Sequence, residues 1–121
     1  RNKEDLIQAI QEIKSLRRDF YKQVFVPGSE NEYNEELAKA CRVADFLELG
    51  ELFAKDALDR EESCGGHFRR EHQSEEGEAL RNDEEFAFVS AWKYDGENND
   101  PKLNKEALEY ENVKLTQRSY K

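Results

Sequence analysis

The first part of the chain carries a helical pattern of apolar positions. From Asn2 to Val24, apolar residues recur at steps of three and four, which is the spacing of one helical face. Asn2 is a favourable N-cap, and Pro27-Gly28 ends the pattern. We therefore predict one amphipathic helix here. Its apolar positions are Leu6, Ile10, Ile13, Leu16, Phe20 and Val24.

A second helix is predicted from about Asn31 to Glu62. This segment has no proline, contains only Gly50 as a glycine, and is rich in Ala, Leu, Glu and Lys. Ser29 and Glu32 have the spacing of a capping box at its start, and a kink is expected near Gly50. Because the connection between the two helices is short, we expect them to lie antiparallel as a hairpin.

Apolar side chains spread around most of the circumference of the second helix in its later part. They are Val43, Phe46, Leu47, Leu49, Leu52 and Phe53. A helix that is apolar all round is buried on several sides, and one partner helix cannot cover it. We expect Phe46, Leu49 and Phe53 to form an interface with a protein surface outside the hairpin, through which the isolated chain would self-associate.

The pattern changes after Ser63. We expect Gly65-Gly66 to end the second helix, because glycine adopts backbone conformations that other residues resist. Residues 86–94 are rich in aromatic side chains with partial alternation, which favours a strand. Residues 108–113 alternate well enough to be its hairpin partner. The final residues, 114–121, are expected to form an extended tail.

The predicted fold is mainly α. A long antiparallel helical hairpin occupies residues 1–65, and a C-terminal extension with a small β-hairpin occupies residues 66–121. The excess of apolar surface on the second helix predicts that a further element completes the helical core.

Composition disfavours several classes of function. The 121 residues carry a formal net charge of -9 with a pI near 4.8, whereas nucleic-acid binding rests on clustered Lys and Arg. The same acidity disfavours anionic lipid, and no apolar run approaches the ~20 residues that span a bilayer. No phosphate-binding glycine pattern occurs. We expect a soluble chain with no nucleic-acid partner, no membrane span and no flavin or nucleotide site of its own.

Two further features concern the origin of the chain. Cys41 and Cys64 lie far apart in a chain rich in helix-forming residues, which indicates a reducing compartment rather than a disulfide framework. The chain contains no Met and shows no charged-then-apolar leader. We therefore expect residues upstream of Arg1 in the parent protein.

The densest group of polar side chains runs from Arg60 to His72. Cys64 and His67 could act as nucleophile and base, which requires a third group that orients the base. They could instead bind zinc, but they supply only two of the four ligands that the metal normally takes. We favour a structural turn with two glycines whose charged residues pair with a neighbouring domain. The candidate interface residues in it are Arg60, Glu62, Ser63, Gly65, His67 and Arg69.

Several segments resemble the C-terminal end of the flavoprotein subunit of succinate dehydrogenase and fumarate reductase. Leu47–Leu52 resembles the L-E-L-x-x-L helix of that family, and Glu62–His67 resembles its E-S-R-G-A-H segment. Downstream, Asp83–Phe86 is similar to the D-D-E/D-N-W stretch, and Val113–Lys121 is similar to the end of the subunit. Cys64 departs from the pattern, because many members have Arg there, and this puts any salt bridge of that arginine in question.

The resemblance implies a parent subunit that binds FAD covalently, interconverts succinate and fumarate, and passes electrons to an iron–sulfur subunit. It implies that the two helices belong to a spectrin-repeat-like three-helix bundle packed against the subunit's own FAD-binding domain. In such enzymes the FAD fold and the substrate-binding residues lie upstream. The chain is then an interface domain that holds no cofactor and is inactive alone, in a cytoplasmic complex peripheral to the inner face of the cell membrane.

Two alternatives stay open on the sequence. The first is the C-terminal domain of a sister flavoenzyme such as L-aspartate oxidase, against which the predicted strand pair and the C-terminal end argue. The second is a stand-alone helical adaptor with no redox role, which an upstream dinucleotide-binding pattern would exclude.

Overall fold

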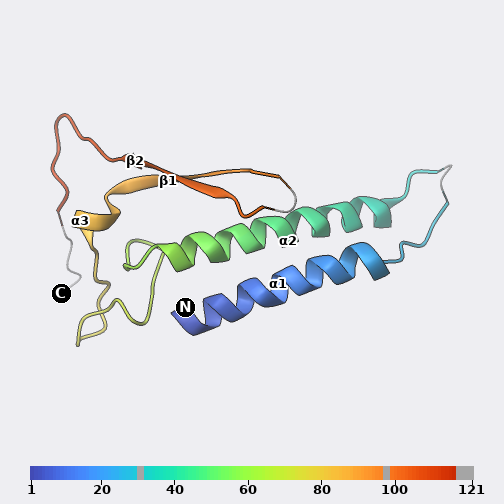
Figure 1. The fold of residues 1–121 in the computed structure, drawn as a ribbon, viewed down its shortest axis with the longest axis horizontal. Helices are drawn as coiled ribbons and strands as arrows, with labels where there is room; N and C mark the ends of the chain where they lie inside the picture. Colours follow the sequence, from blue (N-terminus) through green and yellow to red (C-terminus); the bar gives the residue numbers. More distant parts are fainter. Residues whose placement is uncertain (30–31, 97–98, 117–121) are drawn as a thin grey trace. The chain divides into compact units, whose positions relative to one another are not determined.

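The computed structural model describes residues 1–29, 32–96 and 99–116. The elements follow one another as α1, α2, α3, β1 and β2 (Figure 1). The chain divides into two compact units, residues 1–59 and 60–121. The first unit holds the two long helices, and the second holds the short helix and the strands. Among the described residues, none of the helices has both the length and the hydropathy of a membrane span.

Helix α1 spans Lys3–Gln23. The side chain of Asn2 caps it, because its Oδ1 accepts a hydrogen bond from the backbone N–H of Asp5 at 2.8 Å. At the other end, the N–H of Val24 donates to the carbonyl of Phe20 at 3.0 Å as the chain turns extended. The predicted first helix and its N-cap are confirmed.

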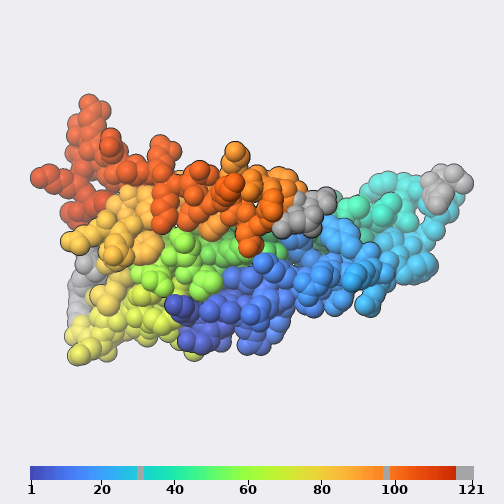
Figure 2. All heavy atoms as spheres, viewed as in Figure 1, coloured from blue at the N-terminus to red at the C-terminus, as the bar shows by residue number. Residues whose placement is uncertain are grey.

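Helix α2 spans Glu35–Asp59 and returns antiparallel to α1, with the atoms of the two helices packed together (Figures 1 and 2). Its cap is Asn34, whose Oδ1 accepts from the N–H of Leu37 at 3.1 Å. The amide nitrogen of Asn34 also donates to the carbonyl of Pro27 at 2.9 Å, which closes the connecting loop. The predicted capping box at Ser29 and Glu32 is therefore wrong, because Asn34 satisfies both the helix and the loop.

The contact between α1 and α2 combines a close approach with a buried charge. A Cβ on Gly50 would lie 3.9 Å from Cδ1 of Ile13, so the glycine faces α1. The next residue, Glu51, is only 6% exposed and accepts a hydrogen bond from Arg17 of α1 at 3.0 Å. Lys55, on α2 itself, lies 2.8 Å from the same carboxylate. Helix α2 continues through Gly50 as a single element.

The second unit holds a two-stranded antiparallel sheet. Strand β1 spans Phe88–Lys93 and β2 spans Lys102–Ala107, with a register that runs from Phe88 opposite Ala107 to Lys93 opposite Lys102. The predicted first strand is confirmed in its central part. The predicted partner at 108–113 is wrong, because the loop after β1 brings the chain back at Lys102 and the ladder is complete before that segment begins.

Two further features complete the second unit. The single-turn helix α3, Asp83–Phe86, was not predicted, and Asn82 caps it by accepting from the N–H of Glu85 at 3.3 Å. Residues 114–116 have no regular secondary structure. The rest of the expected extended tail, residues 117–121, lies outside the described residues.

Candidate interface site

The candidate polar residues follow α2 in a turn that begins at Arg60. Within it, Cys64 and His67 exchange two backbone hydrogen bonds, with N···O distances of 2.8 and 3.0 Å. Gly65 has a φ of +57°, in the left-handed region, whereas Gly66 is not among the positive-φ residues. The expectation that the glycine pair ends α2 is wrong, because the helix already ends at Asp59. The special conformation of Gly65 instead closes this tight turn.

Ser63 is the most buried residue of the segment, with 0% exposure. Its Oγ accepts a hydrogen bond from the N–H of Arg69 at 2.8 Å and donates to the carbonyl of the same residue at 3.2 Å. Its own N–H donates to the carbonyl of Leu80 at 2.7 Å. The Ser63 side chain thus joins the two ends of the turn, and its backbone N–H joins the turn to a later segment of the chain. Any larger side chain at this position would displace them.

Arg60 and Glu62 form a close ion pair, with 2.6 Å between Nη1 and Oε1. Glu62 is 2% exposed, and its second oxygen accepts from the N–H of Asn82 at 2.9 Å. Both carboxylate oxygens are therefore bonded, which is the condition under which a buried carboxylate is tolerated. Because Asn82 caps α3, the same carboxylate fixes the start of that helix.

Arg60 also holds the start of β1. Its Nη1 donates to the carbonyl of Phe86 at 3.1 Å and its Nη2 to that of Phe88 at 3.0 Å. The guanidinium carbon lies 5.8 Å and 4.9 Å from the centres of these two rings, each of which is only 9% exposed. The flat fork of arginine suits this combination of carbonyl bonding and ring stacking, and lysine lacks that geometry.

His67 and Arg69 converge on one backbone carbonyl. Nε2 of His67 lies 3.0 Å from the carbonyl oxygen of Arg60, so this nitrogen carries the proton, because a carbonyl can only accept. Nη1 of Arg69 donates to the same oxygen at 3.4 Å, and Nη2 lies 3.3 Å from a carboxylate oxygen of Glu71. The arrangement fixes the shape of the turn through its backbone. Within the described ranges, no group of three or more His, Cys, Asp or Glu residues is placed to hold a metal ion.

The apolar candidates lie in the first unit. Phe46, Leu49 and Phe53 of α2 are 66%, 49% and 69% exposed, so they take little part in the packing of the helical hairpin. The sequence signal that found them was the spread of apolar side chains around most of the circumference of the second helix. By contrast, the polar candidates Glu62 and Arg69 are buried in the second unit.

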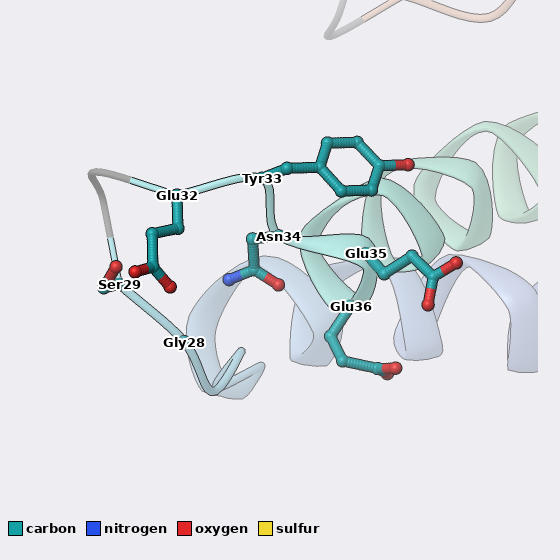
Figure 3. A pocket seen from close by; sticks show the side chains of 7 residues that line it. All are labelled: Gly28, Ser29, Glu32, Tyr33, Asn34, Glu35 and Glu36. Atoms are coloured by element: carbon teal, nitrogen blue, oxygen red, sulfur yellow. The ribbon is translucent and has the colours of Figure 1, made fainter.

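Two small hollows lie near the loop that joins the helices. One, of about 130 Å³, is lined by loop residues and by Glu32, Glu35 and Glu36 (Figure 3). Three carboxylates at its wall would repel a small anion. The other, of about 240 Å³, has a mainly apolar lining that includes Phe20 and Val43, together with one carboxylate, Glu36, and one ammonium group, Lys39. Neither hollow gathers the positive groups that hold an anionic ligand.

Comparison with known proteins agrees with the resemblance in the sequence. A scan against family models matched residues 1–120 to the family described as fumarate reductase flavoprotein C-term. No curated protein and no solved structure matched the chain in the two other searches. Since the match covers nearly every residue, the chain belongs to the family of C-terminal domains of the succinate dehydrogenase and fumarate reductase flavoprotein subunit.

Proposed function

We propose that the chain is a structural and interface domain of a flavoprotein subunit that interconverts succinate and fumarate. In the parent protein, FAD would be bound by a separate domain, and electrons would pass to an iron–sulfur subunit. The domain itself supplies no catalytic group in this proposal. Its parent complex would be cytoplasmic and peripheral to the inner face of the cell membrane.

The observation that carries the proposal is the internal bonding of the turn from Arg60 to Arg69. Glu62 and Ser63 are buried and make their hydrogen bonds to neighbouring segments of the same unit. Polar groups bonded in this way support the shape of the turn. The exposed positions in this turn and directly after it include Gly65, Phe68 and Arg70.

The turn, held in shape by its own hydrogen bonds, therefore offers a partner a surface with both apolar and charged side chains. An aromatic ring and an arginine side chain are among the residue types enriched at protein interfaces. We propose that Phe68 and Arg70 contact the iron–sulfur subunit or another domain of the parent, and that Arg60, Glu62, Ser63, Gly65, His67 and Arg69 hold them in place. The exposed α2 residues Phe46, Leu49 and Phe53 would meet the subunit's own FAD-binding domain.

The test uses the full-length flavoprotein subunit that carries this domain, co-produced with its iron–sulfur subunit. Phe68→Ser and Arg70→Glu should lower the fraction of assembled complex while leaving turnover per bound flavin unchanged. Glu75→Gln, a change at another exposed position of the same unit, is the control and should alter neither. If turnover per flavin fell about a hundredfold, equivalent to ~2.7 kcal/mol of barrier, with assembly intact, the turn would belong to the active site and the proposal would be wrong.

A further inference from the structure

Strand β1 has an edge that faces away from β2, which we call the outer edge. In the described part of the chain the sheet consists of these two strands. The N–H of Leu108 donates to the carbonyl of Ala87 at 2.9 Å, which continues the ladder by one pair. In an antiparallel ladder only alternate residues bond across the pair. Phe88 and Ser90 therefore direct their backbone N–H and C=O groups toward the outer edge.

The side chain of Arg60 occupies the beginning of the outer edge. Its Nη1 and Nη2 donate to the carbonyls of Phe86 and Phe88 at 3.1 and 3.0 Å. These acceptors are two residues apart, which is the spacing of successive outward groups along one edge of a strand. A neighbouring strand would lie about 4.8 Å from β1, in the space that the guanidinium fills. Arg60 thus takes the place that a third strand would need.

The guanidinium of Arg60 is held firmly at this edge. Nη1 also lies 2.6 Å from Oε1 of Glu62, which is 2% exposed and accepts a hydrogen bond from the N–H of Asn82. The rings of Phe86 and Phe88 lie 5.8 and 4.9 Å from the guanidinium carbon. Moving Arg60 away would leave a buried carboxylate without its cation, which is costly.

The segment behind this contact has the composition of a self-pairing strand. Residues 86–92, Phe-Ala-Phe-Val-Ser-Ala-Trp, contain no charge, no proline and no glycine. Such segments add strands from other chains when their edge is open. The other strand, β2, carries Lys102 and Lys105, and lysines on an edge strand oppose pairing. The edge that needs protection is therefore the outer edge of β1.

We propose that Arg60 closes the outer edge against strand addition, and that without its guanidinium β1 pairs antiparallel with β1 of a second copy of this chain. The two-fold register that matches the outward groups places Ser90 opposite Ser90. These two residues exchange N–H···O=C bonds, and Val89, which is 52% exposed, lies beside Ala91 of the second copy. No charge lies in the paired segment, residues 88–92. The inference is independent of the proposed function, because it concerns one strand edge within the second unit.

The first test compares Arg60→Met with the wild-type 121-residue chain over a range of concentrations, with reductant present because Cys41 is exposed. Methionine keeps an unbranched side chain against the rings but has no N–H to donate. The intermolecular β-sheet signal in the infrared spectrum should rise about tenfold or more above wild type, since pairing adds several backbone hydrogen bonds per copy. Exchange of the Ser90 amide should slow as the concentration rises. Association through the exposed side chains of α2 would produce neither change.

The second test changes the outer edge itself. Ser90→Pro removes one outward N–H and leaves the bonds between β1 and β2, and proline is tolerated in edge strands at such positions. Added to Arg60→Met, it should abolish the intermolecular signal. Ser90→Ala in the same background keeps the N–H and should preserve the signal.

Gly65→Val is the control for a general loss of stability. It places a β-branched residue at a φ of +57° in the same unit but leaves Arg60 at the edge, so it should give no intermolecular strand signal. Arg60→Lys, a milder change, should give an intermediate signal and decides the case if Arg60→Met does not fold. Three results would each overturn the proposal: no strand signal in either Arg60 variant, an equal signal in Gly65→Val, or a signal that survives Ser90→Pro.

Discussion

The guanidinium of Arg60 lies 4.9 Å from the ring centre of Phe88 and donates a hydrogen bond to the carbonyl of the same residue at 3.0 Å. Twenty-eight residues separate the two in sequence, so one side chain ties the first residue of the second unit to the entry of β1. An isolated two-stranded hairpin is marginally stable in water. We infer that this attachment is a main source of order for the strands.

Arg60→Ala should therefore destabilise the second unit by roughly 2–4 kcal/mol, because it removes charged hydrogen bonds and leaves the buried carboxylate of Glu62 without its cation. Arg60→Lys should recover only part of this loss, because one ammonium cannot reproduce the planar fork. Hydrogen exchange of the β1 and β2 amides measures the effect. Arg70→Ala, at an exposed arginine of the same turn, is the control. Full protection in Arg60→Lys would show that the bidentate geometry is unimportant.

Gly65 and Gly66 offer a matched pair for testing backbone strain. A Cβ at either position would meet nothing within 4 Å, but only Gly65 has a positive φ. Gly65→Val should lower the free energy of unfolding by about 1–3 kcal/mol, as a β-branched residue is forced into the left-handed region. Gly66→Val should have a much smaller effect. Denaturant titration of both variants checks this, and equal losses would mean that side-chain bulk, not φ, is decisive.

Glu51 predicts a pH dependence for the helical hairpin. Burial raises the pKa of its carboxyl group, but hydrogen bonds from Lys55 and Arg17 and the nearby charges outweigh burial, so the pKa lies below its ordinary value of 4.5. A carboxyl whose folded-state pKa is lowered stabilises the fold above the unfolded-state value. That contribution is lost as the pH falls through the lower folded-state pKa.

The measurement is the thermal stability of the hairpin between neutral pH and the acid range. Stability should fall below about pH 4.5, and Glu51→Gln should be less stable at neutral pH and lose less on acidification. Glu48→Gln is the control, because the Glu48 side chain is 60% exposed and reaches Arg17 only at 4.0 Å. An identical acid profile in Glu51→Gln would remove Glu51 as the titrating group.

Gly50→Ala should stabilise the helical hairpin by about 0.5–1 kcal/mol, because alanine has the higher helix propensity. The added Cβ would make an ordinary contact with Ile13 at 3.9 Å. Gly28→Ala should do the opposite, since Gly28 has a φ of +127° and a Cβ there would collide with the Asn34 amide. Melting temperatures of the two variants provide the test. A loss of stability in Gly50→Ala would show that the helices must approach more closely than this contact allows.

Predictions of the individual elements succeeded where one local signal prevailed. The apolar period of α1 and the cap at Asn2 needed no tertiary information. The predicted start of α2 was wrong because two local capping signals lie close together in the sequence. The folded chain uses Asn34 as the cap, and the same side chain also bonds the carbonyl of Pro27. The strand partner was wrong because alternation in residues 108–113 is a weaker constraint than the loop length that returns the chain at Lys102.

The sequence alone determined the helical hairpin, the presence of a strand at the aromatic run, the exposed apolar side of α2 and the resemblance that the family match confirmed. Each of these depends on spacing along the chain. Only the tertiary structure decided the roles of the polar residues, because these depend on contacts distant in sequence. It placed the carboxylate of Glu62 on the N–H of Asn82 and the guanidinium of Arg60 on two carbonyls more than twenty residues away. Charge and position in a sequence do not specify which buried partner a polar side chain will satisfy, since that is fixed only when the chain has packed.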